Sequence, residues 1–89
     1  MRLDLFLKNT GIIPRRAVAK SACEQGLIEI NGKPAKPAAE VRLGDRLLLR
    51  IGLRVAEYEV LAIPTRAVAK TAREDYARLL RTERLDEQL

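Results

Sequence analysis

Histidine and tryptophan are absent from this 89-residue sequence, cysteine occurs once, and only three residues are aromatic. The lack of histidine removes the most common general base and the most common metal ligand of proteins. Cys23 has no second cysteine and no histidine as a partner, so the chain cannot form an internal disulfide, a thiolate zinc site or a Cys–His nucleophile. A glycine-rich phosphate loop of the form G-x-x-x-x-G-K is also missing. We therefore expect a protein that is not an enzyme and that needs no metal ion or other cofactor.

Long apolar runs are missing too, because the longest extend over only a few residues. They are too short for a transmembrane helix or for the core of a signal peptide. We expect a cytoplasmic protein that does not enter a membrane, and a single unpaired cysteine fits that compartment. The length suits one small domain, and 47% hydrophobic residues is typical of a folded chain.

Positive charge is concentrated in the first half of the chain. Residues 1–52 contain ten lysines and arginines against five acidic residues, a net charge of +5, whereas residues 53–89 contain seven of each sign. A one-sided basic excess is typical of a surface that binds a polyanion. A solvated basic face that only aids solubility would give the same count, so charge alone leaves both interpretations open.

Two amphipathic helices are predicted near the N-terminus. Apolar residues at i, i+3 and i+4 from Leu3 predict a short helix over 3–9. Pro14 is favourable at the first position of a second helix, which we expect to run to about Gln25 and to stop at Gly26. Small residues on its inward face would let the two helices approach closely. These residues are Ala19, Ala22 and Cys23, joined by Val18.

Strands are predicted where short apolar or alternating segments lie between turn signals. The turn signals are Asn31-Gly32, Gly44-Asp45 and Gly52, and the predicted strands cover 27–30, 46–51 and 55–63. A last helix is predicted over 66–82, followed by a polar tail. The fold class is therefore α+β, with two helices packed on a small, mostly antiparallel sheet and a C-terminal helix. Residues 1–64 form the main unit, and residues 65–89 add the helix and tail to the same domain.

One phrase occurs twice, as RAVAKSA at 16–22 and as RAVAKTA at 66–72. The first copy is followed by a helix stop and a hairpin, whereas the second is predicted to continue as a helix. The two are therefore not a tandem structural repeat. In the second copy, Lys70 would meet Glu74 one helical turn later. We thus expect the second copy to be a solvated helix face, with Arg66→Ala having little effect on binding, and the first copy to be the functional one.

Residues 1–52 resemble the S4-like RNA-binding domain. The features that carry the resemblance follow one another in the order of that family. They are the opening RLD with F-L-K, the pair Arg15-Arg16, a helix that ends in Q-G, the turn I-N-G, and the later K-P and G-D-x-L. The resemblance implies two helices on a small curved sheet, with structured RNA bound by the helix pair and the adjoining loop.

The whole chain is similar to a stand-alone subgroup, the RqcP (YabO) type, which stabilises P-site tRNA in bacterial ribosome-associated quality control. This subgroup is favoured over the related fifteen-kilodalton heat-shock protein by the length of the chain, by the patterns RLDxFLK, xxRRxxAK and NGxxAK, and by Tyr76 in the predicted final helix. The resemblance implies binding to ribosomal RNA of the large subunit and to peptidyl-tRNA during alanine tailing, with the tailing factor RqcH on the same subunit. Recycling of free large subunits and a basic protein-interaction module are the alternatives, and we expect a monomer.

Seven cations are predicted to contact RNA. Helical RNA is read mainly through phosphates, 2′-hydroxyls and shape, which calls for arginine and lysine on a rigid scaffold. Phe6 and Tyr58 are expected in the core, which argues against a base-stacking sheet. Asp4 is expected to cap or pair within the fold, with Arg16 as its partner. The predicted RNA-binding residues are Arg2, Lys8, Arg15, Arg16, Lys20, Lys33 and Lys36, and the predicted turn residues are Gly26, Asn31 and Gly32.

Overall fold

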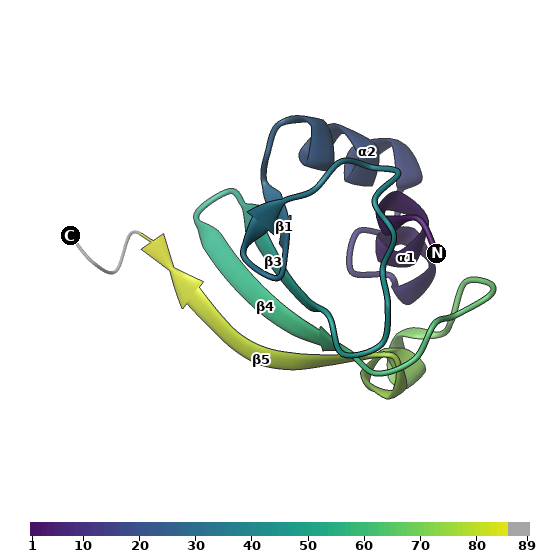
Figure 1. Ribbon diagram of the computed structural model, residues 1–89. Coiled ribbons are helices and arrows are strands. Elements are labelled where there is room, and N and C mark those ends of the chain that lie inside the picture. Colours follow the sequence, from purple (N-terminus) through teal and green to yellow (C-terminus); the bar gives the residue numbers. More distant parts are fainter. Residues whose placement is uncertain (86–89) are drawn as a thin grey trace.

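Two helices lie on one face of an antiparallel sheet in the computed structural model, which describes residues 1–85 (Figure 1). Within these residues the sheet has five strands in the order β2-β1-β3-β4-β5, and every pairing is antiparallel. The elements are α1 (Leu3–Thr10), α2 (Arg16–Glu24), β1 (Ile28–Ile30), β2 (Lys33–Pro34), β3 (Arg46–Ile51), β4 (Arg54–Val60), the 3-10 helix η1 (Lys70–Asp75) and β5 (Ala77–Arg84). None of the described helices has the length and apolar character needed to cross a membrane.

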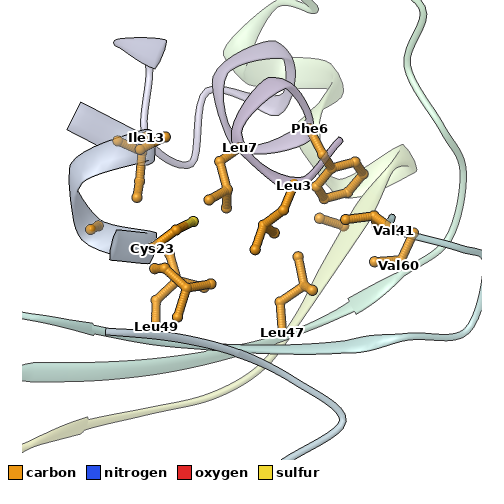
Figure 2. Packing of buried hydrophobic residues seen from close by; sticks show 13 residues of the cluster. Leu3, Phe6, Leu7, Ile13, Cys23, Val41, Leu47, Leu49 and Val60 are labelled. Carbon is orange, nitrogen blue, oxygen red and sulfur yellow. The ribbon is translucent and has the colours of Figure 1, made fainter. Parts of the chain in front are cut away.

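The core lies between α1 and the inner face of the sheet. Leu3, Phe6 and Leu7 are fully buried on one side of α1 and face Leu47 and Leu49 of β3 (Figure 2). Each large apolar side chain removed from water in this way contributes about 1.5–3 kcal/mol. The alternation along β3 turns Arg46, Leu48 and Arg50 to the outer face of the sheet.

Small residues form the inward face of α2, as predicted. Ala19, Ala22 and Cys23 are buried, and their size allows α2 to lie close to α1. Burial raises the pKa of the Cys23 thiol to about 11, with a further contribution from the negative charge of Asp4. The thiol therefore stays protonated at neutral pH and serves as a packing residue.

The hairpin after β1 has the geometry that its sequence predicts. Asn31 and Gly32 adopt φ angles of 52° and 85°, the left-handed pair of a two-residue hairpin turn, and Gly26 at the end of α2 has φ 76°. The Asn31 side chain also joins two strands, since it donates to Asp45 and accepts from the amide of Arg46.

The predicted C-terminal helix over 66–82 is wrong. Residues 70–75 form one short 3-10 helix, and 77–84 form β5, which pairs with β4 from end to end. The local sequence consists of good helix formers, but strand pairing supplies the backbone hydrogen bonds, and cross-strand pairs such as Arg78–Glu59 and Arg81–Glu57 add to them. The last four residues of the predicted polar tail, 86–89, lie outside the described residues.

Smaller boundary predictions also need correction. The second helix begins at Arg16 and not at Pro14, because Arg15 has extended backbone angles and stands at the N-cap. Val18 points to solvent with 51% of its surface exposed and does not join the inward face. Lys33–Pro34 lies outside the predicted strands but forms a two-residue edge strand, a position where proline costs no ladder hydrogen bond.

Candidate nucleic-acid interface

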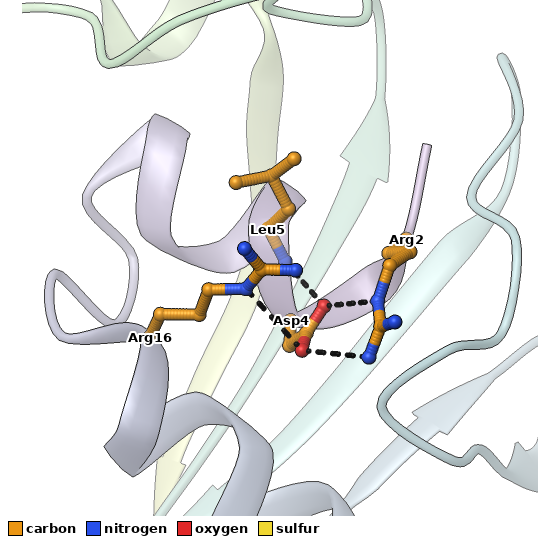
Figure 3. Close-up of polar contacts among 4 residues, drawn as sticks. All are labelled: Arg2, Asp4, Leu5 and Arg16. Atoms are coloured by element: carbon orange, nitrogen blue, oxygen red, sulfur yellow. Dashed lines mark hydrogen bonds and ion pairs between the residues drawn. The ribbon is translucent and has the colours of Figure 1, made fainter.

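The first turns of α1 and α2 meet at a buried carboxylate. Asp4 is only 2% exposed and accepts two hydrogen bonds from Arg2, at 3.1 Å from Nε and 3.2 Å from Nη2 (Figure 3). Nε of Arg16 lies 3.5 Å from the Oδ2 atom of the same carboxylate. The predicted pairing of Asp4 with Arg16 is confirmed, and Arg2 is an additional partner that the sequence did not indicate.

Charge pairing, not burial, dominates the ionisation of Asp4. Burial by itself would raise the pKa of this carboxyl, but the hydrogen bond from Arg2 and the positive charges of Arg16 and Arg2 outweigh it and hold the pKa below its usual value. Asp4 is therefore ionised at neutral pH. Both arginine side chains remain 49% exposed. The carboxylate thus orients two guanidinium groups whose outer sides face solvent.

The loop after β2 runs along the start of α1. The amides of Leu3 and Asp4 donate to the carbonyls of Ala39 and Pro37, at 2.8 and 3.1 Å. These bonds use the first amide donors of α1, and they hold Pro37, with the exposed Lys36 directly before it, along the first turn of that helix. No side chain caps the N-terminus of α2 in the described structure, so the amides of its first turn have no side-chain acceptor.

We call the cations around this junction the helix-pair surface. Arg15 and Lys20 lie on α2 next to Arg16 and one turn beyond it, and both are exposed. Neither takes part in an ion pair within residues 1–85. The members of the surface are Arg2, Arg15, Arg16, Lys20 and Lys36.

Two predicted residues lie apart from that surface. Lys33 is exposed on the edge strand β2, where it pairs with Ile30 of β1. Lys8 lies in the second half of α1 with its side chain partly buried, towards the end that the segment after β4 contacts. The structure therefore brings together five of the seven predicted cations.

The outer face of the sheet also carries several arginines, and Arg50, Arg78 and Arg81 form ion pairs with acidic side chains there. Guanidinium–carboxylate distances there are 3.4 Å for Arg50–Glu29, 3.7 Å for Arg78–Glu59, 3.2 Å for Arg81–Glu57 and 2.6 Å for Arg81–Glu83. Paired charges of this kind largely cancel beyond a few ångströms in salt. Acidic and basic side chains thus pair across the strands on this face, whereas Arg15, Lys20 and Lys36 on the helix side take part in no ion pair within residues 1–85.

Aromatic side chains do not contribute to the helix-pair surface. Phe6 is fully buried, and Tyr58 packs against the core from β4. Tyr76 is half-buried directly after η1. An interface without stacking platforms is suited to phosphates and ribose rather than to unstacked bases.

Arg73 has a structural role that the sequence did not reveal. It was expected on a solvated helix face, but its guanidinium donates to the carbonyl oxygens of Thr10 and Gly11, at 3.0 and 2.8 Å. A Cβ atom on Gly11, which has φ +75°, would stand 3.2 Å from Nη2 of Arg73, so glycine allows this close approach. No local signal could predict a contact across more than 60 residues of sequence.

The arrangement of the possible metal ligands is simple to describe. Across residues 1–85, histidine, cysteine, aspartate and glutamate side chains nowhere gather in a group of three that could hold an ion. The arrangement can instead present fixed positive charge to an anion.

The comparisons agree with this geometry. Residues 1–47, more than half of the chain, match the S4 domain, within the segment where the resemblance was noted. Solved structures share the fold. The trimeric Heat Shock Protein 15 of Vibrio cholerae has a TM-score of 0.83 and 25% sequence identity, and the match covers 89% of this chain and 80% of that protein. The solution structure of a hypothetical protein has a TM-score of 0.78 and 33% sequence identity, and the match covers 93% of this chain and 100% of that protein. The predicted α+β, S4-like fold is confirmed, apart from its C-terminal helix.

Curated relatives extend over almost the whole chain. The RQC P-site tRNA stabilizing factor of Listeria innocua is 40% identical over 87 residues, covering 98% of this chain and 94% of the relative. The factor of the same name from Bacillus subtilis is 38% identical over 87 residues, covering 98% and 100%. That of Helicobacter pylori strain J99 is 42% identical over 65 residues, covering 73% and 77%. The chain therefore belongs to the S4 domain family and, within it, to the RQC P-site tRNA stabilizing factors.

Proposed function

We propose that the chain is a non-catalytic RNA-binding factor that binds the large ribosomal subunit and stabilises P-site tRNA during ribosome-associated quality control. The observation that carries the proposal is the helix-pair surface, where Arg2 and Arg16 are oriented by Asp4 beside the exposed Arg15 and Lys20. This surface lies within the part of the chain that matches the S4 domain, and the relatives' name supplies the ribosomal context.

The chemistry of the surface suits an RNA backbone. Guanidinium groups bind phosphate through two parallel hydrogen bonds, whereas lysine acts as a point charge. Because Asp4 already orders Arg2 and Arg16, binding loses less side-chain entropy than it would with two free arginines. Lys36 adds a charge from the neighbouring loop, and we propose that Lys8 and Lys33 bind at the edges of the contact.

We further propose that the chain binds as a monomer. In the proposed role it holds peptidyl-tRNA against ribosomal RNA in the cytoplasm while alanine is added to the stalled chain, with the tailing factor RqcH on the same subunit. The test is reconstituted tailing on purified large subunits, with and without this chain. Tailing that is equally efficient without the chain contradicts the role.

Removal of single arginines tests the surface itself. Arg16→Ala and Arg15→Ala should each weaken co-sedimentation with large subunits that carry peptidyl-tRNA, by about 1–3 kcal/mol per lost charged contact. The binding constant of the unaltered chain should fall steeply with salt, because phosphate contacts release counterions. Arg78→Ala, on the outer face of the sheet, is the control and should bind normally. Equal losses in all three variants would argue against a defined surface.

One alternative is favoured by the likeness to Heat Shock Protein 15, a structural neighbour with a TM-score of 0.83. A recycling factor for free large subunits would use the same basic surface on a different ribosomal complex. Subunits with and without P-site tRNA separate the two functions, since a tRNA-stabilising factor should bind the tRNA-bearing subunit more tightly. Binding that survives nuclease treatment would instead indicate a protein partner.

A further inference from the structure

The second copy of the repeated phrase is attached to the end of α1. The amide of Val68 donates to the carbonyl of Asn9 at 2.9 Å, and the Asn9 side-chain amide donates to the carbonyl of Pro64 at 3.4 Å. The guanidinium of Arg73 holds the next two carbonyls, those of Thr10 and Gly11. Positive charge at a helix C-terminus is favourable, so these contacts also stabilise α1. A segment outside the S4 match is thereby fixed beside the first helix (Figure 1).

This attachment places two cations beside Lys8. Arg66 and Lys70 lie two residues before and two residues after the anchored Val68, and both side chains are exposed. Lys8 directly precedes Asn9, which accepts the anchoring bond. Within residues 1–85, neither Arg66 nor Lys70 takes part in an ion pair.

The expectation that Arg66 and Lys70 lie on a solvated helix face is not supported by the local structure. It assumed a helix in which Lys70 faces Glu74 one turn later. The structure has a 3-10 helix there, with three residues per turn, so residues four apart do not share a face. Glu74 and Asp75 are exposed further along η1 and weaken the surrounding field, so any anion must be contacted directly by the lysine and arginine.

We propose that Arg66 and Lys70, together with Lys8, form a second phosphate-binding surface, which we call the loop cations. This inference rests on the proposed function, because the ligand is the same RNA. The eight residues of α1 extend about 12 Å, so the helix-pair surface at its start and the loop cations at its end would contact different phosphates. The RNA would then cross the molecule along α1, held at both ends of that helix.

A matched pair of double variants tests the proposal. Arg66→Ala with Lys70→Ala and Arg46→Ala with Arg78→Ala each remove two exposed positive charges, but the second pair lies on the outer face of the sheet. Binding to purified large subunits carrying peptidyl-tRNA is measured across a series of KCl concentrations. The first variant should bind roughly tenfold more weakly, and its salt slope should fall by about one for each lost phosphate contact. The second should keep the slope and the affinity of the unaltered chain.

Variants of the helix-pair surface separate a refutation of the loop cations from a refutation of the proposed function. If Arg15→Ala with Arg16→Ala abolishes binding while Arg66→Ala with Lys70→Ala retains normal affinity and slope, the loop cations are refuted and the proposed function stands. If both retain normal binding, both proposals are refuted. If Arg66→Ala with Lys70→Ala and Arg46→Ala with Arg78→Ala lose the same amount of binding affinity, the effect is one of net charge alone. That result would also refute the loop cations. Thermal unfolding of every variant confirms that each is folded.

Discussion

The segments RAVAKSA and RAVAKTA differ in one residue, yet one is a helix and the other is not. The first lies in α2, where Ala19 and Ala22 pack against α1. The second is an extended loop up to Ala69, followed by the start of η1. Local propensity is nearly the same in both, so the surroundings decide. After the first copy, Cys23 continues the buried face of the helix, whereas Arg73 stands at the equivalent position after the second copy. The second copy is also followed closely by β5, which begins at Ala77.

The largest expected effect distinguishes the two copies by packing. Ala19 is fully buried between the helices, so Ala19→Leu should overpack the core and cost up to about 3 kcal/mol of unfolding free energy. The equivalent change in the second copy, Ala69→Leu, falls on an exposed residue and should change stability by less than about 0.5 kcal/mol. Urea denaturation of both variants measures the difference. Similar losses would mean that the second copy is packed as tightly as the first.

A somewhat smaller effect is expected where the second copy is anchored. Arg73→Ala removes two charge-assisted hydrogen bonds and leaves the buried end of α1 without its donor, which should cost about 2 kcal/mol. Arg66→Ala, in the same segment but without such contacts, should leave stability unchanged. Hydrogen exchange gives an independent readout, because amides near the end of α1 should lose protection only in the Arg73 variant. Equal stability of both variants would contradict the anchor.

The smallest expected effect concerns the acid that orients the first copy. Asp4→Asn should lower stability by about 1 kcal/mol at neutral pH, because a partly exposed pair contributes little more. The folded pKa of Asp4 is depressed, so its contribution is complete above the ordinary value of about 4 and is lost as pH falls through the lower folded value. The stability difference between the unaltered chain and the variant should thus shrink in acid. A difference that stays constant down to low pH would contradict the pairing.

Both helices, the hairpin turns and most of the inward face could be predicted from the sequence. Helical spacing from Leu3, the stop at Gly26 and the Asn31-Gly32 turn depend on interactions within a few residues, which a sequence pattern records directly. The error at 66–82 has the opposite cause. Residues 77–84 have the local composition of a helix, and only a partner strand that is distant in sequence makes them a strand.

The candidate site was predictable in composition but not in arrangement. The excess of basic residues and the pair Arg15-Arg16 are visible in the sequence, and the pairing of Asp4 with Arg16 was predicted from it. Arg2 shares this carboxylate from only two positions away, a contact that helical spacing does not indicate. That Lys36 lies near the start of α1 depends on the loop whose carbonyls accept from the amides of Leu3 and Asp4. Such bonds join residues more than 30 positions apart and leave no periodic signal.

The sequence by itself determined which residue types are absent, where the positive charge lies along the chain, and the two N-terminal helices and the hairpin turns. These properties depend on residue identity and on neighbours within about one helical turn. The tertiary structure alone decided that β5 is a strand, that Arg73 binds the end of α1, and that the second RAVAK copy stands beside Lys8. A strand and a long-range anchor obtain their hydrogen bonds from partners far along the chain, so only the folded molecule determines them.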